Sequence, residues 1–205
     1  MQAALRVLRD EGLDAVTMRR VAEELGAGAA SLYVHVADKD ELHSLMLDRL
    51  LGELELPEPN SKRWQEQLKS LARDLLELME ANMGIARVAI GNPPVGPNAL
   101  RVTEWTLGLL RTAGVPDHVA AYACDFLALY CAAVAFEVSV YAAIGFDQAD
   151  VAERAAQMHQ YFASLPPDRF PNVVALAGPM TAGGGDERFE FGLDLLVSGL
   201  AAAVR

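Results

Sequence analysis

Apolar residues recur at helical spacing along much of this chain, and the pattern predicts an all-α protein. The clearest repeat places four apolar residues at positions i, i+3, i+4 and i+7: Met18, Val21, Ala22 and Leu25. Such a stripe is typical of an amphipathic helix that packs one face on a core. Thr17 is a favoured N-cap before the stripe, and Gly26 is a favoured stop after it. We therefore predict a helix from Thr17 to a turn that begins at Gly26.

A shorter helix is predicted after this turn, in the segment AASLYVHV. Leu32 and Val36 are spaced i, i+4 and can pack inward. The other positions face outward: Ala29, Ala30, Ser31, Tyr33 and His35. The alanines would allow close approach to a major groove, and the three polar side chains are able to meet bases, thymine methyl groups or phosphates. In the alternative interpretation, Tyr33 and His35 instead complete a small three-helix core.

Cations are placed where a DNA backbone could meet them. Arg19 and Arg20 lie in the first turn of the Thr17 helix, where the helix dipole disfavours each cation by roughly 0.3–1 kcal/mol. A DNA phosphate would satisfy both arginines and the unpaired backbone N–H groups at that end. Asp38 and Glu41 form the D-x-x-E spacing of a capping box, which starts a third helix with Lys39 in its first turn. The alternative for the two arginines is solvent exposure beside neighbouring glutamates.

The charge balance opposes indiscriminate DNA binding. The chain has a formal net charge of −11, and residues 1–50 hold six Lys and Arg against nine Asp and Glu, a net of −3. The basic residues nevertheless lie where the motif would meet phosphates, so we predict specific and salt-sensitive binding. The acidic N-terminal segment favours one alternative, a helical protein-interaction module that has lost DNA binding.

The segment TMRRVAEELG…SLYVHVADKDEL resembles the N-terminal domain of the TetR family of transcriptional regulators. The last predicted helix, with the sequence FEFGLDLLVSGL, is similar to the terminal helix of the tetracycline-repressor branch of that family. The resemblance implies a dimeric all-helical repressor that releases a palindromic operator when a small molecule enters its C-terminal domain. It also implies that the terminal helix joins a long apolar helix in a four-helix dimer bundle.

Breaker residues divide the chain. Pro57 and Pro59 interrupt the helical pattern after Leu50, so we predict a DNA-binding domain at 1–48 and a ligand-binding and dimerisation domain at 60–205. Further helices are predicted at 61–83, 85–90, 99–113, 117–144, 147–164 and 186–204, with an irregular segment at 165–186. The breaker-rich residues 91–98 form either a loop that gates a pocket or a plain corner.

The apolar run at 117–144 approaches the length of a membrane span. Glu137 interrupts it, Asp125 adjoins it and no Lys/Arg cluster flanks it, so we predict a buried helix in a cytoplasmic protein. Cys124 and Cys131 are too far apart on one helix for a disulfide. The four histidines lack metal-ligand spacing, and no motif assembles a nucleophile and a base, so neither a metal site nor an enzyme is predicted.

The expected ligand follows from differences between this chain and the tetracycline-binding branch that it resembles. Ala89 stands here at the position of that branch's metal-ligating histidine. Leu71 and Leu75 stand at the positions of its polar drug contacts, and Trp105 stands where it has a glutamine. Glu137 falls on an acidic pocket position, where it would meet a polar group or form a structural ion pair. We expect a largely apolar, aromatic effector among these residues: Leu71, Leu75, Met79, Ala89, Asn92, Trp105, Phe126, Tyr130 and Glu137. The alternative for the Leu and Met positions is ordinary core packing.

The last helix carries a predicted dimer stripe in which small and large residues alternate. Its members recur at i, i+3, i+4, i+7, i+10 and i+11: Phe189, Gly192, Leu193, Leu196, Gly199 and Leu200.

Overall fold

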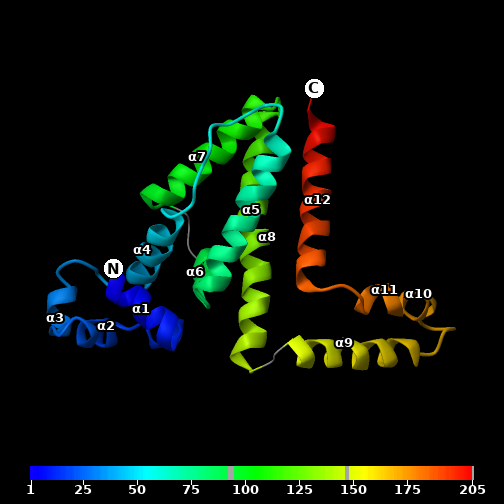
Figure 1. The fold of residues 1–205 in the computed structure, drawn as a ribbon, viewed down its shortest axis with the longest axis horizontal. Coiled ribbons are helices and arrows are strands. Elements are labelled where there is room, and N and C mark those ends of the chain that lie inside the picture. The colour runs from blue at the N-terminus through cyan, green and yellow to red at the C-terminus, as the bar shows by residue number, and fades with distance from the viewer. Residues whose placement is uncertain (92–94, 146–147, 205) are drawn as a thin grey trace. The chain divides into compact units, whose positions relative to one another are not determined.

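A computed structural model describes residues 1–91, 95–145 and 148–204. Those residues are helical without strands, which confirms the predicted all-α class. The elements are α1 (Gln2–Glu11), η1 (Leu13–Ala15), α2 (Met18–Glu24), α3 (Ala29–Leu32), α4 (Lys39–Leu51), α5 (Trp64–Ala81), α6 (Ile85–Gly91), α7 (Pro97–Thr112), α8 (Asp117–Ala143), α9 (Gln148–Ala163), α10 (Pro171–Ala175), α11 (Ala177–Thr181) and α12 (Gly185–Ala203). The chain forms two compact units, residues 1–139 with 193–205 and residues 140–192 (Figure 1).

The first unit begins with a small three-helix core. Leu8 of α1 and Met46 and Leu50 of α4 are almost completely buried there, together with the inward face of α2. Thr17 caps α2 as predicted, because its hydroxyl accepts a hydrogen bond from the backbone N–H of Arg20 at 3.1 Å. Leu25 departs from the predicted stripe and is 51% exposed, because α2 ends at Glu24 and the chain then turns away.

The larger part of the first unit is built on α5, α7 and α8. The amphipathic face predicted for α5 is buried at these positions: Trp64, Leu68, Leu71, Leu75 and Met79. The thiol of Cys131 on α8 donates to the carbonyl of Ala72 on α5 at 3.5 Å, so the two helices are in contact. Burial raises the pKa of Cys131 to about 12, so this thiol stays protonated, and both cysteines are free.

Helix α8 has two different apolar faces. By length and composition it could cross a membrane, but one third of its most apolar window is buried inside the protein. Ala123, Leu127 and Cys131 face inward. The opposite face exposes aromatic and aliphatic side chains: Tyr122, Phe126, Leu129 and Phe136. A helix with little polar surface is therefore only partly covered by its own chain.

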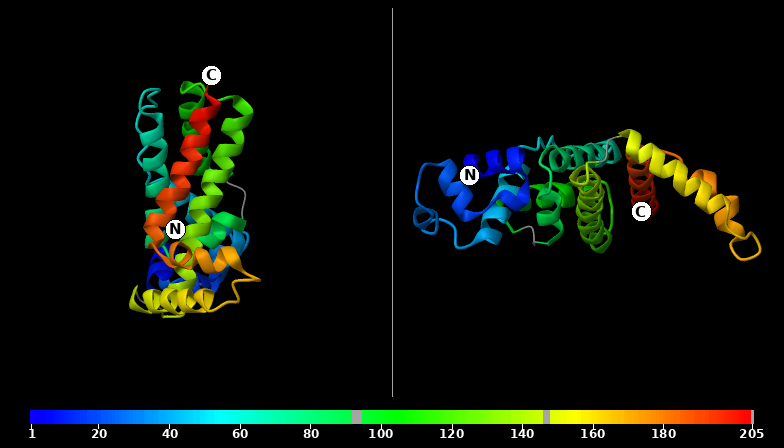
Figure 2. Two further views of the ribbon diagram at one scale, coloured as in Figure 1. Left: turned by 90° about the vertical axis from the view of Figure 1, so that its right-hand side faces the viewer. Right: turned by 90° about the horizontal axis from the view of Figure 1, so that it is seen from below.

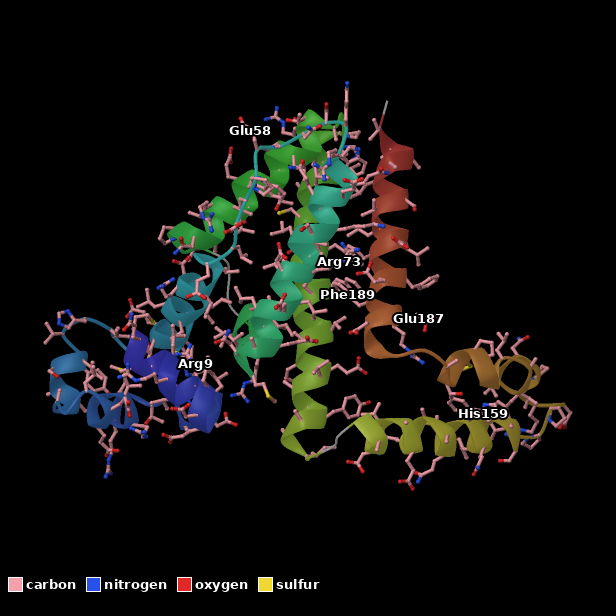
Figure 3. The ribbon with its side chains drawn as sticks, in the orientation of Figure 1. Arg9, Glu58, Arg73, His159, Glu187 and Phe189 are labelled. Carbon is pink, nitrogen blue, oxygen red and sulfur yellow. The ribbon has the colours of Figure 1, made fainter. Side chains whose placement is uncertain are left out.

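The second unit corrects the predicted irregular segment at 165–186. Two short helices form there, α10 and α11, and both contact α9 (Figure 2). Pro171 occupies the first turn of α10, where its fixed φ and missing N–H are tolerated. His159 projects from α9 (Figure 3), with its Nδ1 3.3 Å from the hydroxyl oxygen of Thr181.

In the first unit, Pro97 does not break a helix either. It starts α7 two residues before the predicted beginning of that helix.

Candidate functional site

The turn and short helix after α2 present side chains to solvent. Gly26 has φ +64°, a conformation that glycine adopts easily, and Gly28 precedes the four-residue α3. Of the residues predicted to face outward, Ala30, Ser31, Tyr33 and His35 are exposed and Ala29 is half-buried. The ring of Tyr33 is 56% exposed and so does not close the three-helix core. Leu32 and Val36 are half-buried, as expected for the inward side.

The predicted capping box forms at the start of α4. Asp38 accepts the backbone N–H of Glu41 at 2.8 Å, and the carboxylate of Glu41 accepts the backbone N–H of Ala37. Two acidic side chains therefore accept hydrogen bonds from backbone N–H groups directly after the outward-facing segment. Lys39 follows Asp38 as the first residue of α4 and is half-buried.

The two arginines of α2 lie in different environments. The side chain of Arg19 is 87% exposed and pairs with Glu23 on the same helix at 2.9 Å. Arg20 instead joins α1 to α2: its guanidinium donates to Glu11 of α1 and, at 3.1 Å, to Glu24 of α2. These carboxylates raise the pKa of Arg20, with the hydrogen bond to Glu11 as the largest cause. Arg20 thus has structural partners in the free protein, and a phosphate contact for it stays a prediction.

The residues expected to line a ligand pocket are only partly grouped inside the protein. Leu71, Leu75 and Met79 are buried on α5. Ala89 is half-buried on α6, and Asn92 lies outside the described residues. Since the predicted polar contacts of that branch are replaced by buried leucines here, an apolar lining on α5 remains the expectation.

Three of the pocket predictions need revision. The indole N–H of Trp105 donates to the carbonyl of Pro57 in the segment before α5, and Thr106 takes the inward position, 2% exposed. A shift of one residue on a helix turns a side chain by about 100°, which periodicity alone did not resolve here. Phe126 is 53% exposed and stacks on Tyr130 with ring centroids 6.2 Å apart. Glu137 is exposed, so no buried carboxylate needs a partner there.

The predicted dimer stripe on α12 needs a similar correction. Phe189, Leu193 and Leu200 are at most 4% exposed within a single chain, so they are not available to a second copy. Gly192 and Leu196 are half-buried, and Gly199 is exposed. The physical reason is that α12 carries a second apolar face, and helical spacing does not show which face packs on the same chain.

One hollow lies outside all of these predictions. It has a volume of about 220 Å³ and is lined by residues of α1, of α4 and of the segment after α4: Gln2, Leu5, Arg6, Arg9, Arg49 and Glu53 (Figure 3 labels Arg9). Arg6 pairs with Glu24 and Arg49 with Glu53. No group of three His, Cys, Asp or Glu side chains in the described part of the chain is placed to hold a metal ion.

Two helices joined by a glycine turn, with polar side chains exposed on the second helix and directly after it, are the geometry of a helix-turn-helix DNA-binding protein. Comparison with known proteins agrees. Residues 1–44 match the description "Bacterial regulatory proteins, tetR family", and residues 56–204 match "Tetracyclin repressor-like, C-terminal domain". The chain belongs to the TetR family of transcriptional regulators, which confirms the predicted resemblance.

Individual relatives match over nearly the full length. An HTH-type transcriptional regulator of Saccharopolyspora erythraea is 31% identical, over 98% of this chain and 83% of that protein. The transcriptional repressor DrrR1 of Streptomyces coeruleorubidus is 32% identical, over 100% and 76%. Crystal structures of ActR from Streptomyces coelicolor, in the apo form and with actinorhodin, are 44% identical over 98% of this chain and 94% of that chain, with TM-scores of 0.87 and 0.88. The protein is therefore a DNA-binding transcriptional regulator of a family that is not enzymatic.

Replacing Arg20 by Ala is expected to lower the thermal unfolding midpoint of the full chain, because Arg20 joins carboxylates of two helices. Arg19→Ala is the matched control and should leave the midpoint nearly unchanged, since Arg19 pairs with a neighbour on its own helix. Circular dichroism on heating measures both. An Arg20→Ala midpoint equal to that of Arg19→Ala would contradict the structural role.

The destabilisation by Arg20→Ala should also depend on pH. Hydrogen bonds from Arg6 and then Arg20 lower the pKa of Glu24 from its ordinary value of 4.5. A carboxylate with a lowered folded-state pKa stabilises the protein at neutral pH, and this contribution is lost as the pH falls below 4.5 through the folded-state value. The midpoint difference between wild type and Arg20→Ala should therefore shrink in acid. A difference that stayed constant would argue against the ion-pair explanation.

Proposed function

We propose that this protein is a dimeric cytoplasmic repressor that binds a palindromic operator and leaves it when a small, largely apolar effector binds. The observation that carries the DNA-binding part is the outward presentation of Ser31, Tyr33 and His35 directly after a glycine turn. Side chains at these positions are those that a recognition helix places against base edges. Ala29 and Ala30 keep the start of that helix narrow. Arg19, Arg20 and Lys39 are the proposed phosphate contacts.

The proposal of a dimer is supported by the exposed face of α8. Its members are spaced alternately four and three residues apart: Tyr122, Phe126, Leu129, Ala133, Phe136 and Val140. This heptad spacing is typical of a helix that packs lengthwise against other helices. On α12, Phe191 and Leu195 are also exposed and four residues apart. Large contiguous apolar patches on soluble proteins mark interaction sites, and a two-fold copy would cover both faces and imply equivalent operator half-sites.

The proposal of an apolar effector is supported by the buried leucines and methionine on the inner face of α5. Ligand pockets are lined mostly by apolar side chains with few polar groups. ActR has been solved with actinorhodin and with (S)-DNPA, so a relative at 44% to 45% identity binds these two compounds. We propose a ligand of related character for this chain, between α5 and α7, with Tyr130 reached from the same or the partner subunit.

The DNA-binding proposal predicts that two groups of variants change DNA binding in different ways. Duplexes retained from a random pool by the wild-type protein define the operator. Tyr33→Ala and His35→Ala should change the order of affinity among operator mutants. Arg19→Ala, Arg20→Ala or Lys39→Ala should weaken binding to all sequences alike, and should lower the slope of log affinity against log salt concentration by about one. Arg63→Ala is the control, since Arg63 is an exposed, ion-paired arginine at the start of α5. Retention of no duplex by the wild type would favour the protein-interaction alternative.

The effector proposal predicts which compounds release the retained duplex. Actinorhodin or (S)-DNPA should release it, and magnesium–tetracycline should not, because Ala89 supplies no metal ligand where the tetracycline-binding branch has histidine. Leu75→Trp should reduce the response by filling the lining of α5, and Leu176→Trp, at an exposed leucine, is the control. Fluorescence anisotropy of labelled duplex measures release. Release by magnesium–tetracycline would contradict the proposal.

The dimer proposal predicts that Phe126→Arg and Leu195→Arg each produce monomers, since an unpaired charge would be buried at the interface. Val34→Arg is the matched control because Val34 is also exposed and apolar but lies after α3. Light scattering at micromolar concentration gives the mass. A monomeric wild-type protein, or dimeric Phe126→Arg and Leu195→Arg variants, would overturn this assignment.

A further inference from the structure

The first turn of α7 is capped by a side chain from a different helix. Asp48, in the last turns of α4, accepts the backbone N–H groups of Asn98 and Ala99, both at 2.9 Å, through one carboxylate oxygen. Its other oxygen accepts the side-chain amide of Asn98 at 3.0 Å. The N-cap position of α7 is Gly96, which has no side chain to perform this task. Asp48 therefore satisfies the N–H groups that a helix N-terminus leaves unpaired.

The end of α4 is capped in return by α7. Arg101, one turn into α7, donates from Nη2 to the carbonyls of Leu51 and Leu54, both at 3.0 Å. A carboxylate thus lies at the positive end of one helix dipole and a guanidinium near the negative end of the other. Since these contacts span about fifty residues of sequence, they fasten the helix that follows the DNA-reading segment to a helix of the C-terminal domain.

The packing around Gly96 shows how close the two helices are. A Cβ atom at Gly96 would lie 2.2 Å from a carboxylate oxygen of Asp48 and 2.4 Å from its carboxyl carbon. Gly96 has φ −69°, which any residue adopts, so the position needs glycine for space and not for backbone conformation. Asp48 itself is only 9% exposed, although it carries an acidic side chain. A buried carboxylate with three N–H donors is well satisfied while both helices hold their positions.

We propose that Asp48, Gly96 and Arg101 form a latch that makes α4 and the first turn of α7 move as one body, and that this latch transmits effector binding to the DNA-reading helices. The inference rests on the proposed function. Helix α4 carries Met46 and Leu50 into the three-helix core, and α7 contacts α5, which bears the proposed effector lining. Movement at α5 and α7 therefore reaches the recognition segment through the paired caps. The three residues are positioning residues that contact neither DNA nor effector.

Hydrogen exchange of the full-length protein tests the latch without any ligand. Asp48→Asn keeps the size of the side chain and removes its charge, so the amides of Asn98 and Ala99 should exchange about tenfold faster. Arg101→Met removes the reciprocal cap and does not touch these amides. If the two caps act together, Arg101→Met should still accelerate their exchange by about threefold. Asp14→Asn is the control, because Asp14 makes an exposed ion pair with Arg87 between η1 and α6.

The operator duplex retained from the random pool tests transmission. Binding of this duplex to the wild type should change exchange at Asn98 and Ala99, since coupling between two sites is reciprocal. In Asp48→Asn and Arg101→Met, duplex binding should change the exchange rates of these amides by less than about twofold. Operator affinity should stay within about threefold of wild type. Wild-type exchange at both amides in Arg101→Met, or an undiminished operator response in both variants, would overturn the latch.

The two failures are distinguishable. A wild-type protein that retains no duplex would refute the proposed function and with it transmission to DNA. The exchange comparison in the free protein would still decide whether the paired caps join α4 to α7.

Discussion

The placement of α4 against α7 depends on one buried carboxylate. Asp48 lies where a helix N-terminus has unpaired N–H groups, and Gly96 leaves the space that lets the carboxylate reach them. Leaving a buried donor or acceptor unsatisfied costs roughly 1–3 kcal/mol for each group, so a small displacement that breaks these hydrogen bonds without admitting water is costly for both helices. Arg101 adds the complementary contact to the carbonyl of Leu51 at the end of α4. This pair of caps joins α4, which supports the DNA-reading helices, to the first turn of α7.

The recognition segment depends on the same support. Helix α3 has four residues, and a helix of that length has no stability of its own in water. Its position is fixed from both sides, by the Gly26 turn before it and by the Asp38 and Glu41 caps after it. Both caps belong to the start of α4. A shift of α4 would therefore act on Tyr33 and His35 through the caps that directly follow them.

Local sequence signals predicted the features that are determined locally. The N-cap at Thr17, the capping box at Asp38 and the buried face of α5 follow from spacing and residue type within one helix, and all three are found. The all-helical class followed from the same periodicity, and the family followed from the resemblance of the segment TMRRVAEELG…SLYVHVADKDEL. Features set by packing were not predictable in this way. The partners of Asp48 lie about fifty residues away, and no pattern around it indicates a cap for another helix.

Helices with two apolar faces limit prediction most. On α12 the periodic stripe contains Leu193, which is fully buried in its own chain, whereas Leu195 on the other face is 60% exposed. The choice between Trp105 and Thr106 on α7 has the same origin, since both positions carry a side chain able to pack. Only the tertiary structure decides which face packs on the chain itself and which face stays exposed.

The acidic composition is compatible with DNA binding because the acids near the reading segment are already engaged. Glu11 and Glu24 pair with Arg20, and Asp38 and Glu41 accept backbone N–H groups. Arg19 is highly exposed beside them. Interactions between exposed charges fall off over about 8 Å at physiological salt, so a phosphate at α2 experiences these nearby groups far more than the net charge of −11. The distant acids are largely screened from such a phosphate, so the negative net charge does not by itself oppose binding at α2.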